Sequence, residues 1–155
     1  MAKKPVEQHE QFVFEVGPAS WVYHFSIQPD RHDPDPYWEH QSLEFPAQCL
    51  HPDRFKGREA KVRVMGSRDI AGRDRGRRPD KPPNGVGFIE IRGQRFEVML
   101  SLPSDACWAV GHAISAGSIR YLLTNGPRVL RGKAMVRSMS FDGPQFVPAD
   151  YMADE

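Results

Sequence analysis

Two-residue alternation between residues 87 and 102 is the feature that most constrains the fold of this 155-residue chain. In its second half Phe96, Val98 and Leu100 occupy every other position, and Glu97 and Met99 lie between them. A period of two is typical of a β-strand with one buried face. The short glycine-containing segment at 92–94 divides the run into two such strands. The sequence therefore predicts a β-hairpin with one solvated face.

Turn residues divide the rest of the chain into further short strands. Asn125-Gly126 is a strong turn signal, because both residues tolerate positive φ, and it predicts a second hairpin between strands at 118–124 and 128–141. Earlier strands are expected at 11–16, 21–27, 42–50 and 58–65. The 13 glycines and 14 prolines fit short elements better than a helical bundle. About eight strands result.

One helix is expected at about 104–116, between the two hairpins. Ser104 can cap its start and Gly117 can end it. Cys107 and Ile114 fall on one face at helical spacing, beside small residues that allow close approach to a sheet. The predicted fold is therefore mainly β: an antiparallel β-sandwich or a partly open barrel of about eight strands with one α-helix.

A chain of this length normally forms one hydrophobic core, so residues 1–155 are expected to be a single domain. The ends at 1–9 and 148–155 are expected to fray. Residues 68–84 are rich in Arg, Gly and Pro and predict a flexible loop. No apolar stretch is long enough for a secretory signal or a bilayer span, so a cytoplasmic location without membrane contact is expected.

The sequence contains no motif typical of an enzyme active site. Walker loops, GxGxxG turns before helices, nucleophile elbows and CxxC pairs are all absent from it. Cys49 and Cys107 are expected to be buried small hydrophobic residues. A helix N-terminus can lower the pKa of a thiol such as Cys107, but His112 lies on a different side of that helix. We therefore predict no catalytic residue and no cofactor.

Charge is sorted into blocks along the chain. Residues 1–55 carry 4 basic and 9 acidic side chains, residues 56–141 carry 17 and 7, and residues 142–155 carry none and 4. The overall net charge of +1 therefore conceals a basic middle between acidic ends. Such asymmetry bears on binding partners rather than on fold.

Basic side chains in the middle block predict a binding surface. They come from the strand near residue 60, from the last long strand, where alternation places them on one face, and from the loop at 68–84. The candidates are Lys61, Arg63, Arg73, Arg75, Arg77, Arg78, Arg131, Lys133 and Arg137. If the two strands are neighbours, their basic residues form one stripe along the sheet.

The leading hypothesis is a non-enzymatic binding or assembly module that uses this basic surface to contact an acidic protein partner or a second copy of the chain. The acidic C-terminal residues Asp150, Asp154 and Glu155 make self-association one way to satisfy the charges. A sequence-tolerant RNA- or DNA-binding protein is the alternative. The last strand offers Met135 and Met139 where aromatic stacking residues would be expected, which weakens that alternative.

A second alternative is an enzyme or metal-binding protein with a site in the histidine-rich N-terminal third. Five of the six histidines precede residue 52: His9, His24, His32, His40 and His51. Asp and His side chains at 30–40 are of the types that bind zinc, but they are also turn residues and match no HExxH pattern, so no metal ligand is predicted. Tyr37 and Trp38 in the same segment either mark a contact surface or fold back onto the core.

Overall fold

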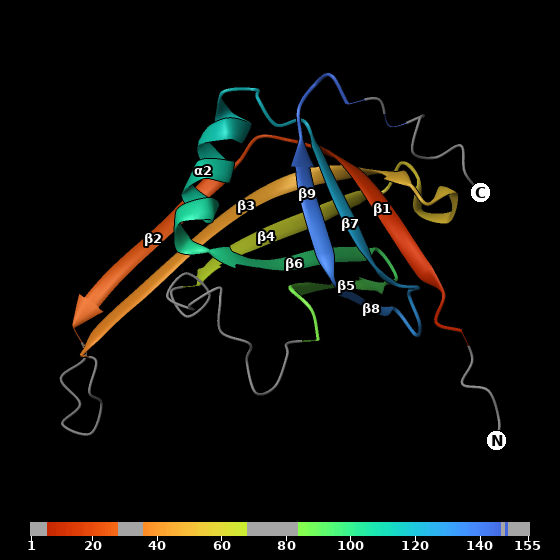
Figure 1. Ribbon diagram of the computed structural model, residues 1–155, viewed down its shortest axis with the longest axis horizontal. Coiled ribbons are helices and arrows are strands. Elements are labelled where there is room, and N and C mark those ends of the chain that lie inside the picture. Colours follow the sequence, from red (N-terminus) through yellow and green to blue (C-terminus); the bar gives the residue numbers. More distant parts are fainter. Residues whose placement is uncertain (1–5, 28–35, 68–83, 147, 149–155) are drawn as a thin grey trace.

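The computed structural model describes residues 6–27, 36–67, 84–146 and 148, and in them nine strands form one sheet that is nearly closed into a barrel (Figure 1). The elements are β1 (His9–Val16), β2 (Ser20–Ile27), β3 (Tyr37–His51), the 3₁₀ turn η1 (Asp53–Phe55), β4 (Glu59–Ser67), β5 (Gly87–Arg92), β6 (Arg95–Pro103), α2 (Ser104–Ser115), β7 (Tyr121–Pro127), β8 (Lys133–Val136) and β9 (Ser138–Asp142). The predicted β-rich, partly open barrel with one helix is confirmed.

The strands follow the order β8-β5-β6-β4-β3-β1-β7-β9, and β2 pairs with β3 outside this path. All pairs are antiparallel except β4 with β6, which run parallel. The barrel nearly closes where β8 meets β7, since the amide of Arg137, which follows β8, donates to the carbonyl of Asn125 in β7 at 2.8 Å. One seam between β7 and β8 therefore stays incompletely paired, which leaves the barrel partly open.

Aromatic rings fill the centre of the barrel. Phe12 and Phe14 from β1 stack with their ring centroids 5.8 Å apart, and Phe96 from β6 lies edge-on to Phe14 at the same distance. All three side chains are almost completely buried. Rings from distant strands thus fix the barrel cross-section, because offset and edge-on pairs add to the free energy of burial.

The helix α2 follows β6 directly and lies across the end of the barrel (Figure 1). Its buried residues are Cys107, Gly111 and Ile114, which matches the predicted face and the predicted range to within one residue. Ser104 makes no side-chain cap; its carbonyl instead accepts a hydrogen bond from Gln41 Nε2 at 2.8 Å. A β-carbon on Gly111 would lie 1.6 Å from a ring carbon of Trp21, so glycine is required for this close packing.

The predicted turn at Asn125-Gly126 is wrong, because β7 continues through both residues to Pro127. Gly126 is needed there for space rather than for positive φ: a β-carbon would lie 2.0 Å from the carbonyl oxygen of Met135 at the seam. The chain turns later, where Arg131 and Gly132 adopt φ of 52° and 78°.

The predicted continuous strand at 128–141 is also wrong. It consists of two short strands, β8 and β9, which lie at opposite ends of the strand order and pair with β5 and β7 respectively. The alternation shifts by one residue between them, since Ala134 and Val136 are buried in β8, whereas Met139 and Phe141 pack against the core from β9.

The first residues of β3 extend beyond the barrel. β3 pairs with β4 only from Ser42 to Gln48, whereas its residues 37–41 pair only with β2 among the described strands. We call the ribbon formed by residues 23–27 and 37–41 the arm; it projects from the sheet at the lower left of Figure 1.

Several expectations concern segments outside the described residues. These are most of the ends predicted to fray and nearly all of the loop at 68–84. The sequence predicts a frayed N-terminus through residue 9, whereas His9 begins β1 opposite Pro127. No helix in the described part of the chain combines the length and apolar composition needed to cross a bilayer.

Candidate functional site

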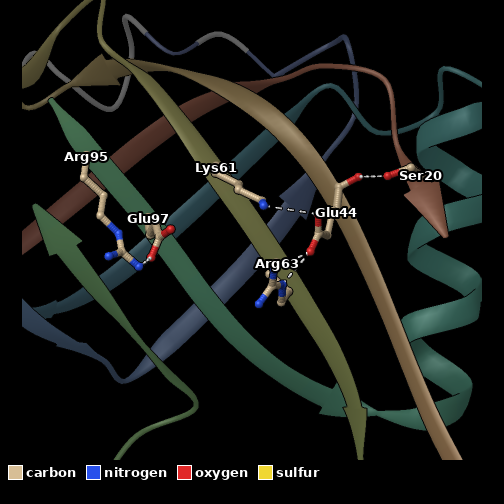
Figure 2. Close-up of polar contacts among 6 residues, drawn as sticks. All are labelled: Ser20, Glu44, Lys61, Arg63, Arg95 and Glu97. Carbon is tan, nitrogen blue, oxygen red and sulfur yellow. Dashed lines mark hydrogen bonds and ion pairs between the residues drawn. The ribbon is translucent and has the colours of Figure 1, made fainter. Parts of the chain in front are cut away.

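The two predicted basic residues on β4 share one carboxylate. Arg63 Nη2 lies 2.6 Å from Glu44 Oε1 on β3, and Lys61 Nζ lies 3.5 Å from Glu44 Oε2 (Figure 2). The hydrogen bond from Arg63 lowers the pKa of Glu44, although burial acts in the opposite direction. Much of the positive charge predicted for this strand is therefore compensated within the fold.

The predicted basic stripe does not form, because β4 and β8 are not neighbours. β6 and β5 lie between them, and the strand register places Lys61, Glu97, Glu90 and Lys133 in one row across the four strands. Glu97 also accepts a hydrogen bond from Arg95 at 2.7 Å, which lowers the pKa of Glu97 (Figure 2). Two carboxylates thus separate the cations that were expected to lie together.

The replacement Glu44→Gln is expected to lower the free energy of unfolding by about 0.5–1 kcal/mol at neutral pH. A carboxyl whose pKa is lower in the folded state stabilises the fold above its unfolded-state pKa, and this contribution is lost as the pH falls through the folded-state pKa. The variant and the wild type should therefore converge once the pH falls below the lowered folded-state pKa of Glu44. Urea titrations across this range measure the difference. Glu59→Gln is the control, since Glu59 has no ion pair in the described part of the chain; an equal change in both variants would contradict the prediction.

A basic cluster does exist, but around the β5–β6 turn. Arg58 Nη2 donates to the carbonyl of Gly93 in that turn at 2.6 Å, and the amide of Ile91 donates to the carbonyl of Gly132, which brings the 128–132 loop alongside. We call this cluster the basic end; its residues are Arg58, Arg92, Arg95, Arg131 and Lys133. The carboxylates on the same strands are Glu59, Glu90 and Glu97, so the basic end keeps a positive excess.

The remaining predicted basic residues lie elsewhere. Nη1 and Nη2 of Arg137 donate to the two carboxylate oxygens of Glu7, at 2.9 Å each, so this residue is paired. The loop residues Arg73, Arg75, Arg77 and Arg78 lie outside the described residues. The structure thus brings Arg131 and Lys133 to the basic end and separates them from Lys61, Arg63 and Arg137.

Neither cysteine has the environment of a nucleophile. Both thiols are free and completely buried, as predicted. Burial raises the pKa of Cys49 to about 12 and also raises the pKa of Cys107. The lowering that a helix N-terminus can produce at Cys107 is therefore outweighed by desolvation.

The histidines do not gather into a metal site within the described ranges. His24 and His40 lie opposite each other on the arm, and Trp38 contacts both rings at centroid distances of 5.1 and 5.9 Å. His51 is buried at the other end of β3. No group of three or more His, Cys, Asp or Glu side chains is close enough together to hold a metal ion in this part of the chain.

A hollow of about 620 Å³ lies beside the C-terminal end of α2. Among its lining residues only Arg120 is ionisable, and Arg120 Nη2 pairs with Glu15 at 2.8 Å. General acid–base catalysis requires a positioned proton donor or acceptor near the reacting group. This hollow does not present such a group.

An exposed apolar surface follows the arm, and only part of it was anticipated. Odd-numbered residues of β3 such as Leu43 and Phe45 face the barrel core, and the same face of the ribbon continues onto the arm. Beyond the barrel, this face of the ribbon presents large side chains to solvent. They are Tyr23, Phe25, Ile27 and Tyr37, together with Trp108 from α2, with exposed fractions of 53%, 50%, 64%, 54% and 36%. We call these five residues the apolar arm face.

Ring contacts hold the apolar arm face together. Trp108 stacks on Trp21 at a centroid distance of 4.7 Å and contacts Tyr23 at 6.0 Å. Phe25 and Tyr37 stack at 5.8 Å. The aromatic surface is therefore preorganised, which reduces the entropy lost when a partner binds.

The arm also has an open strand edge. Within the described part of the chain β2 pairs only with β3. The sequence of Ser20–Ile27 contains no charged residue and no proline, although edge strands are usually protected by such residues. Unprotected backbone donors and acceptors therefore lie beside exposed apolar side chains.

Comparison with protein-family models, with curated proteins and with solved structures found no match to this chain. Function must therefore be inferred from the surfaces themselves.

Proposed function

We propose that this protein is a non-enzymatic binding or assembly module that engages another polypeptide at the arm. The observation that carries the proposal is the combination of an open strand edge on β2 with the apolar arm face beside it. An extended segment that adds to such an edge gains main-chain hydrogen bonds, and its alternate side chains gain apolar contacts. Large exposed apolar patches on soluble domains commonly mark this kind of interface.

The side chains on the arm are of the types that dominate binding energies. Tyrosine and tryptophan are enriched among the residues whose truncation weakens protein–protein complexes most. Tyr23 and Trp108 contact each other at the base of the arm, while Phe25 and Tyr37 extend the surface toward its tip. A partner strand laid along β2 would set its side chains beside Tyr23 and Phe25, from the base of the arm toward its tip.

The basic end supports a second candidate, contact with an acidic protein surface. Arg92 and Arg95 flank the β5–β6 turn with 65% and 61% of their side chains exposed, although Arg92 pairs with Glu90 at 3.0 Å and Arg95 with Glu97 at 2.7 Å. The basic end and the arm lie toward opposite ends of the long axis (Figure 1). Binding of single-stranded nucleic acid combines cations and stacking rings on one surface. The separation therefore favours a protein partner over RNA or DNA at the basic end.

The replacement Phe25→Lys tests the arm. With a displayed library of extended peptides of alternating apolar pattern, the wild type is expected to retain peptides, and the variant is expected to lose at least about tenfold in affinity. Phe88→Lys is the matched control, because Phe88 is 43% exposed on β5, a strand paired on both sides. Hydrogen exchange should slow at β2 amides on binding. Equal losses in both variants, or protection confined to other strands, would contradict the proposal.

A further inference from the structure

The strand parity fixes which backbone groups of β2 face its open edge. On the β4 side of β3, the amide of Cys49 donates to the carbonyl of Arg58, and the carbonyl of Cys49 accepts from the amide of Gly57. The carbonyl of Pro46 points to the opposite side of β3, where it accepts from the amide of Gly17. The backbone N–H and C=O groups of even-numbered β3 residues therefore point toward β2. Their partners across the ladder are Ser20, Val22, His24 and Ser26. It follows that the backbone groups of Trp21, Tyr23, Phe25 and Ile27 point outward.

We propose that the polypeptide that adds to β2 is β2 of a second copy, paired antiparallel about a two-fold axis at His24. This inference rests on the proposed function and names its partner. Centred on His24, the pairing sets Tyr23 opposite Phe25 of the second copy and Trp21 opposite Ile27 of the second copy. All four outward-facing residues then exchange hydrogen bonds. Centring on Tyr23 would instead set Ile27 opposite Ala19, which lies outside β2.

The absence of Asp, Glu, Lys and Arg from β2 favours a second copy of the chain as the partner. A two-fold interface brings each surface patch against itself, so any charge within it repels its own image. β2 carries no Asp, Glu, Lys or Arg along its eight residues. The strand is therefore self-complementary, in contrast to the basic end, which a second basic end would repel.

Neighbouring segments of the chain have too few apolar residues to cover the arm instead. Residues 28–35, which join β2 to β3, contain no large apolar side chain, and residues 68–83, which follow β4, contain only Ile70. Neither composition can supply an apolar cover for the five residues of the apolar arm face.

The size of the exposed surface also suits a dimer. Five large side chains about half exposed, at roughly 200 Å² each, amount to on the order of 500 Å² per copy. A standard interface buries about 800 Å² per partner. The backbone edge of β2 and the side chains Val22 and Trp38, which are 51% and 43% exposed on the opposite face of the arm, add to the surface that a second copy can contact.

A cysteine on the two-fold axis tests the pairing directly. In this register His24 faces His24 of the second copy as a non-hydrogen-bonded pair, for which the Cα atoms lie about 4.5 Å apart, within the range that a disulfide bridges. On mild oxidation with copper phenanthroline, His24→Cys is expected to form a covalent dimer on non-reducing gels. Val22→Cys, on the same face of the same strand, is expected to stay monomeric on these gels, because it lies opposite Ser26. Cross-linking of Val22→Cys instead, or of both variants equally, would overturn the proposal.

Light scattering after size exclusion separates this inference from the proposed function. The full chain is expected to be a dimer, with at least a tenfold weaker association in Phe25→Lys and unchanged association in Phe88→Lys. A monomeric wild type that still retains extended peptides through Phe25 would overturn the dimer and leave strand addition intact. A monomeric wild type that retains no peptide would overturn both.

Discussion

Replacement of Phe14 by alanine is expected to lower the free energy of unfolding by about 3–5 kcal/mol. The ring is completely buried and contacts the rings of Phe12 and Phe96. Its removal forfeits the transfer free energy of the side chain and leaves a cavity that the paired strands around it cannot easily fill by moving together. Urea denaturation followed by circular dichroism measures the loss.

Phe88→Ala provides the matched comparison for Phe14→Ala. Phe88 lies on the outer face of β5 and is 43% exposed, so its truncation is expected to cost only about 1 kcal/mol. A cost at Phe14 no larger than the cost at Phe88 would mean that the stacked rings do not hold the barrel together.

The replacement Gly111→Ala is expected to lower the free energy of unfolding by about 1–3 kcal/mol. Helix propensity alone predicts the opposite sign, a gain of about 1 kcal/mol. Steric overlap outweighs it, because the new β-carbon would lie 1.6 Å and 2.0 Å from two ring carbons of Trp21. Either α2 or the indole must move, and both positions are coupled through the stack of Trp21 on Trp108.

Two measurements follow the displacement at Gly111. Urea titration gives the stability, and near-ultraviolet circular dichroism reports the tryptophan stack. Ala109→Leu, on the exposed side of the same helix, is expected to leave both signals nearly unchanged. A stabilised Gly111→Ala variant with a native tryptophan signal would show that the helix tolerates the added methyl group.

Local sequence patterns were sufficient to predict most elements of this fold. Alternation placed the hairpin of β5 and β6, and the small residues of 104–116 indicated a helix that packs closely. They failed at Gly126, where the same residue type serves either a turn or a close approach of two strands. Only the position of Met135 across the seam distinguishes the two, and that contact depends on strand order rather than on neighbours in the sequence.

Charge patterns predicted the basic residues but not their surroundings. Lys61 and Arg63 alternate on one face as expected, yet Glu44, which compensates them, comes from another strand. The arm was harder to anticipate, because Tyr23 and Phe25 have the pattern of a half-buried strand. Their exposure follows from β3 extending past β4, and nothing local to residues 21–27 indicates where a neighbouring strand ends.

The position of β1 has a consequence for the order in which the protein is completed on the ribosome. Among the described strands β1 is synthesised first, and both of its neighbours in the sheet, β3 and β7, come later in the chain. The contact between Glu15 and Arg120 spans 105 residues. A nascent chain that has not yet emerged as far as β7 therefore carries β1 with one bare edge. Closure of the barrel must wait until β7 has been made, because β1 pairs with this distant segment.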